Sequence, residues 1–530
     1  MARIKITVLI VLFAYSNIYG QNTTNIDVQH YRFELILSDH TDTIRGRATV
    51  SLKFLENASI FHLDLGNVDS TGKGMMVVSV KEAGTPVSFR HSNGKLRLQL
   101  TAAAKAGNNQ VFTVEYMGIP SDGLVIGKSI FNKRTFFGDN WPNRAHHWLP
   151  CNDIPADKAS VEFLITAPKH FSIVSNGIKV EERLLNDSSK RTHWKEDVPL
   201  PTKVMVIGAA DFAVSEPAYA GNIPVTSWVY AEEKDKGFKD YAPAKDILLY
   251  YIDYIGPYPY KKLANVQSKT IFGGMENAGA IFYYEKSVTG GGGLEDLLAH
   301  EIVHQWFGDM VTETDFKHLW LSEGFATYLT DVYIESKYGT DSMNRRLDEQ
   351  RSVVNSFAEK STLPVVDTSS NYMRLLNANS YQKGGWILHM LRNTVGDRAF
   401  KNIIREHYRK FAGKNSSSAD FVATAEMVVK KNLKPFFNQW LYKPGTPILA
   451  TTWKYNAAKR NVIIVVEQKQ PSLFSFPLEL ELKTANGNIL KTVTVQKRKT
   501  SIVLPVKGEV TEMMTDPNYK LLWKAYPVIN

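Results

Sequence analysis

The sequence predicts a multidomain α+β protein with a β-rich N-terminal domain, a mixed α/β middle domain and a small C-terminal β-sandwich. The chain has 530 residues, more than one hydrophobic core usually supports. Apolar residues alternate with polar ones in the first part, recur at helical spacing in the second, and alternate again in the last. We place the domains at residues 21–218, 219–445 and 446–530, after a separate segment at 1–20.

Residues 1–20 have the layout of a secretory signal peptide. Arg3 and Lys5 precede the apolar run "ITVLIVLFAY", and small residues end the segment before Gln21. The apolar run is too short to span a bilayer comfortably, although a retained membrane anchor is the alternative. We expect removal of this segment and export to the periplasm or the extracellular space, with no stable membrane anchor afterwards.

Cysteine content and charge narrow the functional class. Cys151 is the only cysteine, so the chain has no internal disulfide, which fits a bacterial periplasm better than a eukaryotic secretory route. The net charge is +10, or +8 without Arg3 and Lys5, and no basic run carries interleaved aromatic residues. We therefore expect no nucleic-acid partner.

Period-two alternation predicts strands from about Tyr31 to Phe212. In "RATVSLKF" the apolar positions are 48, 50, 52 and 54, and "KLRLQL" at 95–100 alternates in the same way. Asn93-Gly94, just before the second run, is a hairpin-turn signal. These patterns indicate a large antiparallel β domain.

Helical periodicity begins near Lys239 and ends near Pro444. It is clear in "YAPAKDILLYYIDYIG", "RAFKNIIREHYRKFAG" and "SADFVATAEMVVKKN", with Ser418 placed to cap the last helix. Beyond Gly445 the runs "NVIIVVEQ" and "LELELKTANGNILKTVTV" return to strand, with Asn486-Gly487 as a hairpin turn. The tail is the right size for a small β-sandwich.

The stretch "LLAHEIVHQWFGD" places three titratable residues in an otherwise apolar helix. His300 and His304 are four residues apart, so both project from one helix face and can reach one metal ion. Glu301 is turned about 100° around the axis, where a carboxylate can accept a proton from water. The alternative is a core helix with two hydrogen-bonded histidines.

A third ligand is expected downstream. Glu323, at the start of the helical segment "HLWLSEGFATYLTDVYIES", follows His304 after eighteen residues, enough for a loop and a return. A glutamate at a helix start more often has a capping role, but next to the HExxH pattern the ligand role is favoured.

Together these motifs resemble peptidase family M1, the aminopeptidase N family of gluzincin metallopeptidases. HExxH with Glu323 in "WLSEGFATY" is accompanied by "GGMEN" upstream and by "YQKGG", which contains Tyr381, downstream. "LPCNDIPADK" and "FFNQWLYKPGTP" extend the resemblance over nearly all of the mature chain.

The resemblance implies a zinc aminopeptidase with a thermolysin-like catalytic domain, acting on peptides that have a free N-terminus. It implies one Zn²⁺ per chain, with Glu301 as general base and Tyr381 as the donor to the oxyanion. The implied metal ligands are His300, His304 and Glu323, and the implied substrate-binding residues are Gly273, Gly274, Met275, Glu276 and Asn277.

Two alternatives and two departures from the family pattern stay open. A gluzincin endopeptidase is disfavoured by GGMEN, and a non-catalytic peptide-binding scaffold is disfavoured because no ligand or base is missing. Where the family often has a Gln or Glu that assists amine recognition, this chain has Trp141, with Asp139 nearby. Asp309 stands where the family usually has Asn, and could orient a ligand histidine or be solvated. Phe272 is expected to line the pocket for the first side chain.

Overall fold

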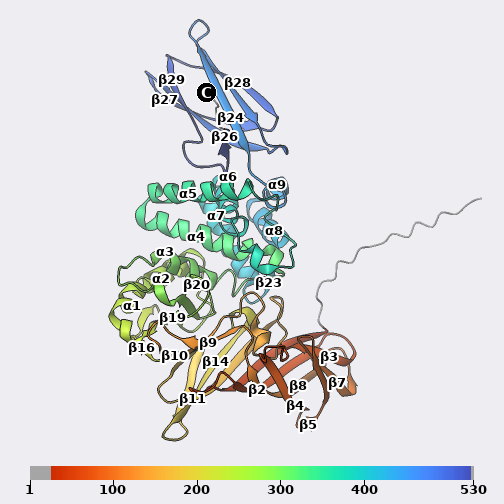
Figure 1. Cartoon of the computed structure of the whole chain (residues 1–530). Helices are drawn as coiled ribbons and strands as arrows, with labels where there is room; N and C mark the ends of the chain where they lie inside the picture. Colours follow the sequence, from red (N-terminus) through yellow and green to blue (C-terminus); the bar gives the residue numbers. More distant parts are fainter. Residues whose placement is uncertain (1–24, 527–530) are drawn as a thin grey trace, which may run out of the picture.

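The computed structural model describes residues 25–526, so the predicted signal segment at 1–20 lies outside the described residues. Three parts follow one another along the molecule: the N-terminal β domain, the helical middle and the C-terminal sheets (Figure 1). The predicted multidomain α+β fold is confirmed. No described helix is both long enough and apolar enough to cross a lipid bilayer.

The N-terminal domain contains an eight-stranded, a four-stranded and a three-stranded sheet. Their strand orders are β13-β14-β11-β1-β2-β8-β4-β5, β12-β15-β10-β9 and β3-β7-β6. The strands are β1 (Ile26–Ile36), β2 (Ile44–Phe54), β3 (Ala58–Asp64), β4 (Gly74–Glu82), β5 (Thr85–Pro86), β6 (Ser88–Ser92), β7 (Lys95–Ala104), β8 (Asn109–Ile119), β9 (Leu124–Lys128), β10 (Arg134–Gly138), β11 (Lys158–Pro168), β12 (Ser172–Ser175), β13 (Ile178–Leu184), β14 (Ser189–Pro201) and β15 (Ile207–Ala210).

The sequence patterns explain these strands. In β2 the apolar positions 48, 50, 52 and 54 are all buried, as the alternation predicts for a strand with one face on the core. Asn93 and Gly94 both have positive φ, 54° and 71°, and join β6 to β7 as the expected two-residue hairpin.

A mixed sheet of order β16-β18-β19-β21-β20, with β17 paired to β18, begins just before the predicted middle domain and continues into it. Its strands are β16 (Phe212–Val214), β17 (Ala218–Ala220), β18 (Ile223–Tyr230), β19 (Leu263–Ser268), β20 (Gly274–Met275) and β21 (Ala280–Tyr284), and a separate small pair is β22 (Thr312–Glu313) and β23 (Asn415–Ser416). The α-helices are α1 (Lys234–Tyr241), α2 (Ala244–Tyr254), α3 (Glu295–His304), α4 (Trp320–Tyr338), α5 (Thr340–Ala358), α6 (Gly384–Val395), α7 (Asp397–Phe411), α8 (Ser418–Val429) and α9 (Lys434–Tyr442).

Short helical turns connect these elements. They are the 3₁₀ turns Ala145–His147, Thr202–Val204, Ala231–Glu233, Glu285–Ser287, Phe316–His318 and Tyr372–Leu375, and one π-helical turn at Asn379–Lys383. The π-helical turn runs directly into α6.

The C-terminal domain has two facing sheets, as predicted. One has the order β28-β25-β24-β30 and the other β27-β26-β29 (Figure 1). The strands are β24 (Ile448–Asn456), β25 (Asn461–Gln468), β26 (Phe476–Thr484), β27 (Gly487–Val495), β28 (Lys499–Pro505), β29 (Val510–Thr515) and β30 (Lys524–Ala525).

Two local predictions were wrong by one residue. The cap of α8 is Ser417, which forms a capping box with Asp420, while Ser418 lies inside the helix and accepts a hydrogen bond from the Trp320 indole at 2.8 Å. The β26–β27 hairpin pairs Thr484 with Gly487, so its turn residues are 485 and 486, and Gly487 takes the positive φ at the start of β27.

Candidate metal and substrate site

Helices α3 and α4 bring three potential metal ligands together. His300 and His304 project from α3 and Glu323 from the first turns of α4. The Nε2 atoms of the two histidines are 3.3 Å apart, and they lie 3.5 and 3.4 Å from Oε2 of Glu323. Ligand bonds of about 2.0–2.1 Å in tetrahedral zinc sites correspond to donor separations of about 3.3–3.4 Å. The donor set and its spacing therefore fit a zinc ion.

His304 is oriented by hydrogen bonds on its other nitrogen. Nδ1 donates to the carbonyl of Phe307 at 3.0 Å, and the hydroxyl of Ser322 lies 3.1 Å away. With the proton on Nδ1, the Nε2 lone pair is free to bind a metal. Neither of the two possibilities left open for the Asp309 side chain holds: its carboxylate is fully buried and accepts from the amide of Gln305 rather than from a ligand histidine.

Gln305, which the sequence analysis missed, connects the metal helix to the GGMEN segment. Its side-chain amide donates to the backbone carbonyl of Glu276 at 2.7 Å and to Asp309 at 3.0 Å. Its oxygen accepts from the backbone N–H of Gly279 at 2.7 Å. The only sequence feature that could have pointed to Gln305 is its position directly after the HExxH motif.

Glu301 and Gly274 share one small space. Glu301 is buried, and a methyl group at position 274 would lie 2.2 Å from its Oε1 atom. Only glycine at 274 therefore permits this carboxylate position. Burial raises the pKa of Glu301 well above its ordinary value, so the carboxylate holds a proton readily.

The GGMEN segment lies at a free sheet edge. β20, formed by Gly274 and Met275, is the last strand in its sheet and, among the described strands, pairs only with β21. The carboxylate of Glu276 is buried, and its Oε1 atom has no hydrogen-bond partner among the described residues. Burial also raises the pKa of Glu276. A buried carboxylate oxygen without a partner is costly, and a cationic group that bound there would offset this cost. Asn277 is buried beside it.

Tyr381 lies in the π-helical turn before α6, with its ring stacked on that of His300 at 6.0 Å between centroids. Burial and the nearby carboxylates of Glu323, Glu276 and Glu301 raise the pKa of Tyr381 well above its usual value. The phenol therefore keeps its proton and can act as a hydrogen-bond donor.

Most of these groups line one cavity of about 260 Å³; the predicted substrate-binding residue Asn277 does not, and neither do Gln305 and Asp309. It contains all the predicted metal and catalytic residues and the segment from Phe272 to Glu276, and Trp141 completes one wall. Asp139 does not line it; the Asp139 carboxylate is fully buried behind the wall and bound to Arg144 at 2.7 Å. Thus Trp141, rather than Asp139, is placed to contact a ligand.

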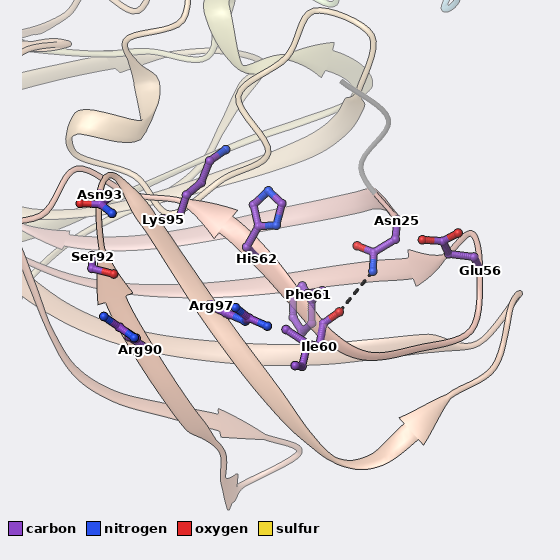
Figure 2. A pocket seen from close by; sticks show the side chains of 10 residues that line it. All are labelled: Asn25, Glu56, Ile60, Phe61, His62, Arg90, Ser92, Asn93, Lys95 and Arg97. Carbon is purple, nitrogen blue, oxygen red and sulfur yellow. Dashed lines mark hydrogen bonds between the residues drawn. The ribbon is translucent and has the colours of Figure 1, made fainter. Parts of the chain in front are cut away.

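A larger cavity of about 730 Å³ lies on the β3-β7-β6 sheet of the N-terminal domain (Figure 2). Basic side chains line part of it, including Arg90 and Arg97, and Lys95 is ion-paired with Asp64. Among the described residues, the one cluster with ligand atoms close enough for a metal is that of His300, His304 and Glu323. The candidate metal site of the described residues therefore lies in the smaller cavity.

With the fold and the candidate metal site described, comparisons with known proteins give the family of this chain. Residues 27–204 match the peptidase M1 N-terminal domain, and residues 241–440 match the peptidase family M1 domain. Together these matches cover more than half of the 530 residues, so the chain belongs to peptidase family M1.

Similar proteins are named as aminopeptidases. Glutamyl aminopeptidase of Rattus norvegicus is 26% identical over 69% of this chain and 41% of its own length. Probable aminopeptidase 2 of Sulfurisphaera tokodaii is 26% identical over 81% and 56%, and leucyl aminopeptidase of Saccharolobus solfataricus is 22% identical over 90% and 61%. The chain thus spans about two fifths to three fifths of the length of these relatives.

A crystal structure of a two-domain M1 zinc metallopeptidase bound to L-arginine has a similar fold. Its TM-score is 0.68 at 22% identity, over 79% of this chain and 95% of that one.

Proposed function

We propose that this chain is a zinc-dependent aminopeptidase that removes N-terminal amino acids from peptides. The observation that carries the proposal is one cavity that holds both a zinc-spaced donor set and the buried Glu276 carboxylate, whose Oε1 atom has no hydrogen-bond partner among the described residues. The donor set supports hydrolysis, and the carboxylate supports selection of a free α-amino group. The named relatives support the same reading.

In this proposal the hydrolytic roles divide among three groups. Zinc, when bound by His300, His304 and Glu323, supplies Lewis-acid chemistry that lowers the pKa of water and polarises a carbonyl. Glu301 accepts a proton from the attacking water and passes it to the leaving amine. Tyr381 donates its phenolic hydrogen to the oxygen that gains negative charge.

Substrate registration rests on the GGMEN segment. The ammonium of the first residue pairs with Glu276, and the extended peptide adds to the free edge of β20 at Gly273 and Gly274. The interior of a peptide has no positive charge there and would leave Glu276 buried and unpaired. Exopeptidase behaviour follows from that difference.

The proposal is tested with matched peptides and elemental analysis. We expect one zinc per chain and cleavage of a free leucine-headed peptide, with no cleavage of its N-acetylated form. Equal cleavage of both forms would instead indicate an endopeptidase. Absence of both zinc and cleavage in folded protein would indicate a peptide-binding scaffold.

We also propose that the protein is exported to the periplasm or the extracellular space. The support is the composition of residues 1–20. Mass spectrometry of the protein from fractionated host cells should find an exported form that starts near Gln21. A full-length form that begins at Met1 and stays in the cytoplasm would contradict the proposal.

A further inference from the structure

Two aromatic rings from different domains form one wall of the site cavity. Trp141 follows β10 in the N-terminal domain, and Phe272 precedes β20 in the middle domain. Their rings meet edge to face, with centroids 5.8 Å apart and an interplanar angle of 89°. Both line the cavity. Because 131 positions separate them in sequence, something other than chain connectivity must keep this contact in place.

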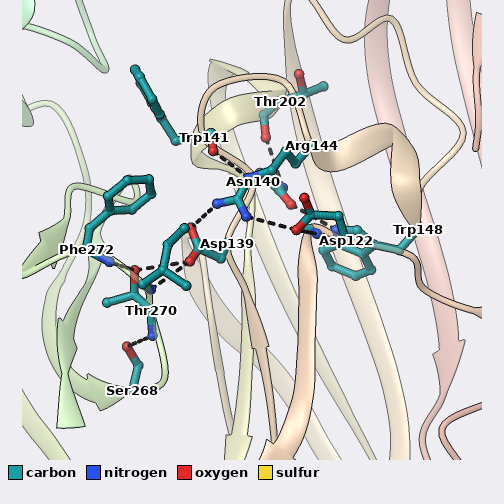
Figure 3. Close-up of polar contacts among 12 residues, drawn as sticks. Asp122, Asp139, Asn140, Trp141, Arg144, Trp148, Thr202, Ser268, Thr270 and Phe272 are labelled. Carbon is teal, nitrogen blue, oxygen red and sulfur yellow. Dashed lines mark hydrogen bonds and ion pairs between the residues drawn. The ribbon is translucent and has the colours of Figure 1, made fainter. Parts of the chain in front are cut away.

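The guanidinium of Arg144 lies between the segments that carry Trp141 and Phe272 (Figure 3). Arg144 donates from Nε to the backbone carbonyl of Trp141 at 2.7 Å, and from Nη2 to Oδ1 of Asp139 at 2.7 Å. Its third nitrogen, Nη1, donates to Oδ1 of Asp122 at 2.9 Å, and its guanidinium carbon lies 5.9 Å from the centre of the Phe272 ring. The side chain is 14% exposed, so solvent screens these contacts weakly.

Asp139 extends this network into the middle domain. Its second oxygen, Oδ2, accepts from the hydroxyl of Thr270 at 3.2 Å and from the backbone N–H of Ile271 at 3.1 Å (Figure 3). The carboxylate is fully buried, so its position depends on these partners and on Arg144. Thr270 and Ile271 directly precede Phe272, whose backbone N–H donates to the Thr270 hydroxyl at 3.3 Å.

We propose that Arg144 and Asp139 are positioning residues that hold Trp141 and Phe272 as an uncharged wall for the first side chain of the substrate. This inference rests on the proposed aminopeptidase function. Neither residue touches the reacting groups, since neither lines the cavity. Their effect therefore falls on which first residue is accepted.

The composition of the cavity selects an apolar first side chain and rejects an acidic one. Its uncharged side chains include Trp141, Phe272 and Leu376, and no Lys or Arg among the described residues lines it. The ionisable groups that line it are the carboxyl groups of Glu276, Glu301 and Glu323, the two histidines of the donor set and the phenol of Tyr381. An acidic side chain would find no cation beyond the metal position and would lose its hydration against aromatic rings.

The test is a ratio, because a ratio of kcat/KM values does not depend on how much enzyme is active. In the wild type, kcat/KM for leucine-headed substrates should exceed kcat/KM for alanine-headed substrates by about tenfold or more. The excess over kcat/KM for glutamate-headed substrates should be larger still. Arg144→Met and Asp139→Asn should each lower the leucine-to-alanine ratio by about fivefold or more, with kcat for the alanine substrate within about threefold of wild type. Phe272→Ala should lower the ratio at least as far.

Arg134→Met is the matched control. Arg134 also lies next to an aromatic ring and bonds backbone and carboxylate groups, Ser38, Thr41 and Asp42, but it does not line the cavity. Its ratio should equal that of the wild type. If Arg144→Met does not fold, Asp139→Asn decides the question.

The outcomes separate this inference from the proposed function. An active wild type whose leucine-to-alanine ratio is unchanged in the Arg144 and Asp139 variants overturns the positioning role and leaves the aminopeptidase function standing. A wild type that hydrolyses none of the substrates overturns the proposed function. In that case the same ratio is measured from the Kd values of L-leucine and L-alanine by calorimetry, and a ratio unchanged by both variants again overturns the positioning role.

Discussion

The position of Glu301 depends on the absence of a side chain at Gly274, which makes Gly274→Ala an informative substitution. A Cβ atom at position 274 would lie 2.2 Å from Oε1 and 2.4 Å from Cδ of Glu301. Favourable contacts between heavy atoms begin near 3.5 Å, so the Glu301 carboxylate has to move by roughly 1 Å.

This movement should change the stability of the fold little and lower kcat strongly. The clashing atoms are the end of a flexible side chain, and the three atoms nearest to the new methyl group all belong to Glu301 rather than to a metal ligand. Folding and zinc content should therefore stay close to wild type. A misplacement of about 1 Å at a catalytic group costs about 10²-fold in rate, so kcat should fall by about 100-fold. At about 1.36 kcal/mol per tenfold, this is about 2.7 kcal/mol of activation free energy.

The assay is kcat on a leucine-headed fluorogenic substrate, with zinc measured on the same samples. Gly293→Ala is the matched control: Gly293 is exposed, and a methyl group there meets nothing within 4 Å. It should leave kcat and zinc unchanged. A Gly274→Ala enzyme with kcat within threefold of wild type would refute the argument that this glycine positions the base.

Four further predictions follow from the same geometry. Glu301→Gln should keep zinc, because Glu301 is not among the converging donors, and should lower kcat by about 10²–10⁴-fold. A loss of zinc that matches the loss of activity would show that Glu301 is a ligand. Tyr381→Phe should lower kcat by about 10²–10³-fold with KM little changed, and a normal kcat would make Tyr381 structural. Glu276→Ala should abolish the difference in rate between free and N-acetylated peptides, and a persistent difference would move amine recognition elsewhere. Burial lowers the pKa of His407 from 6.5 to about 3, so below pH 6.5 the unfolded chain binds a proton that the folded chain does not. The stabilising contribution is complete above pH 6.5 and is lost toward pH 3 at about 1.4 kcal/mol per pH unit. His407→Phe should remove that slope from urea unfolding curves between pH 7 and 4, and an unchanged slope would exclude His407 as its source.

Local periodicity was enough to predict much of the fold and part of the site. The alternation in β2 and β7 and the turn at Asn93-Gly94 depend on neighbouring residues, so a single sequence contains them. The helical spacing of His300 and His304 is equally local, and α3 places both on one face as expected. Glu323 was favoured as a ligand only because it follows the HExxH pattern, since its return to α3 depends on how two helices pack.

Only the tertiary structure decided which neighbours these residues have. Three consecutive serines made Ser418 a reasonable cap, but the indole of Trp320 engages Ser418 and leaves Ser417 to cap α8. The empty space at Gly274 and the contact between Trp141 and Phe272 involve residues far apart in sequence. Helix and strand periods repeat every two to four residues and specify which face of an element is apolar. They carry no information about which distant side chain fills the space opposite, and in this protein that packing shapes the wall of the substrate cavity.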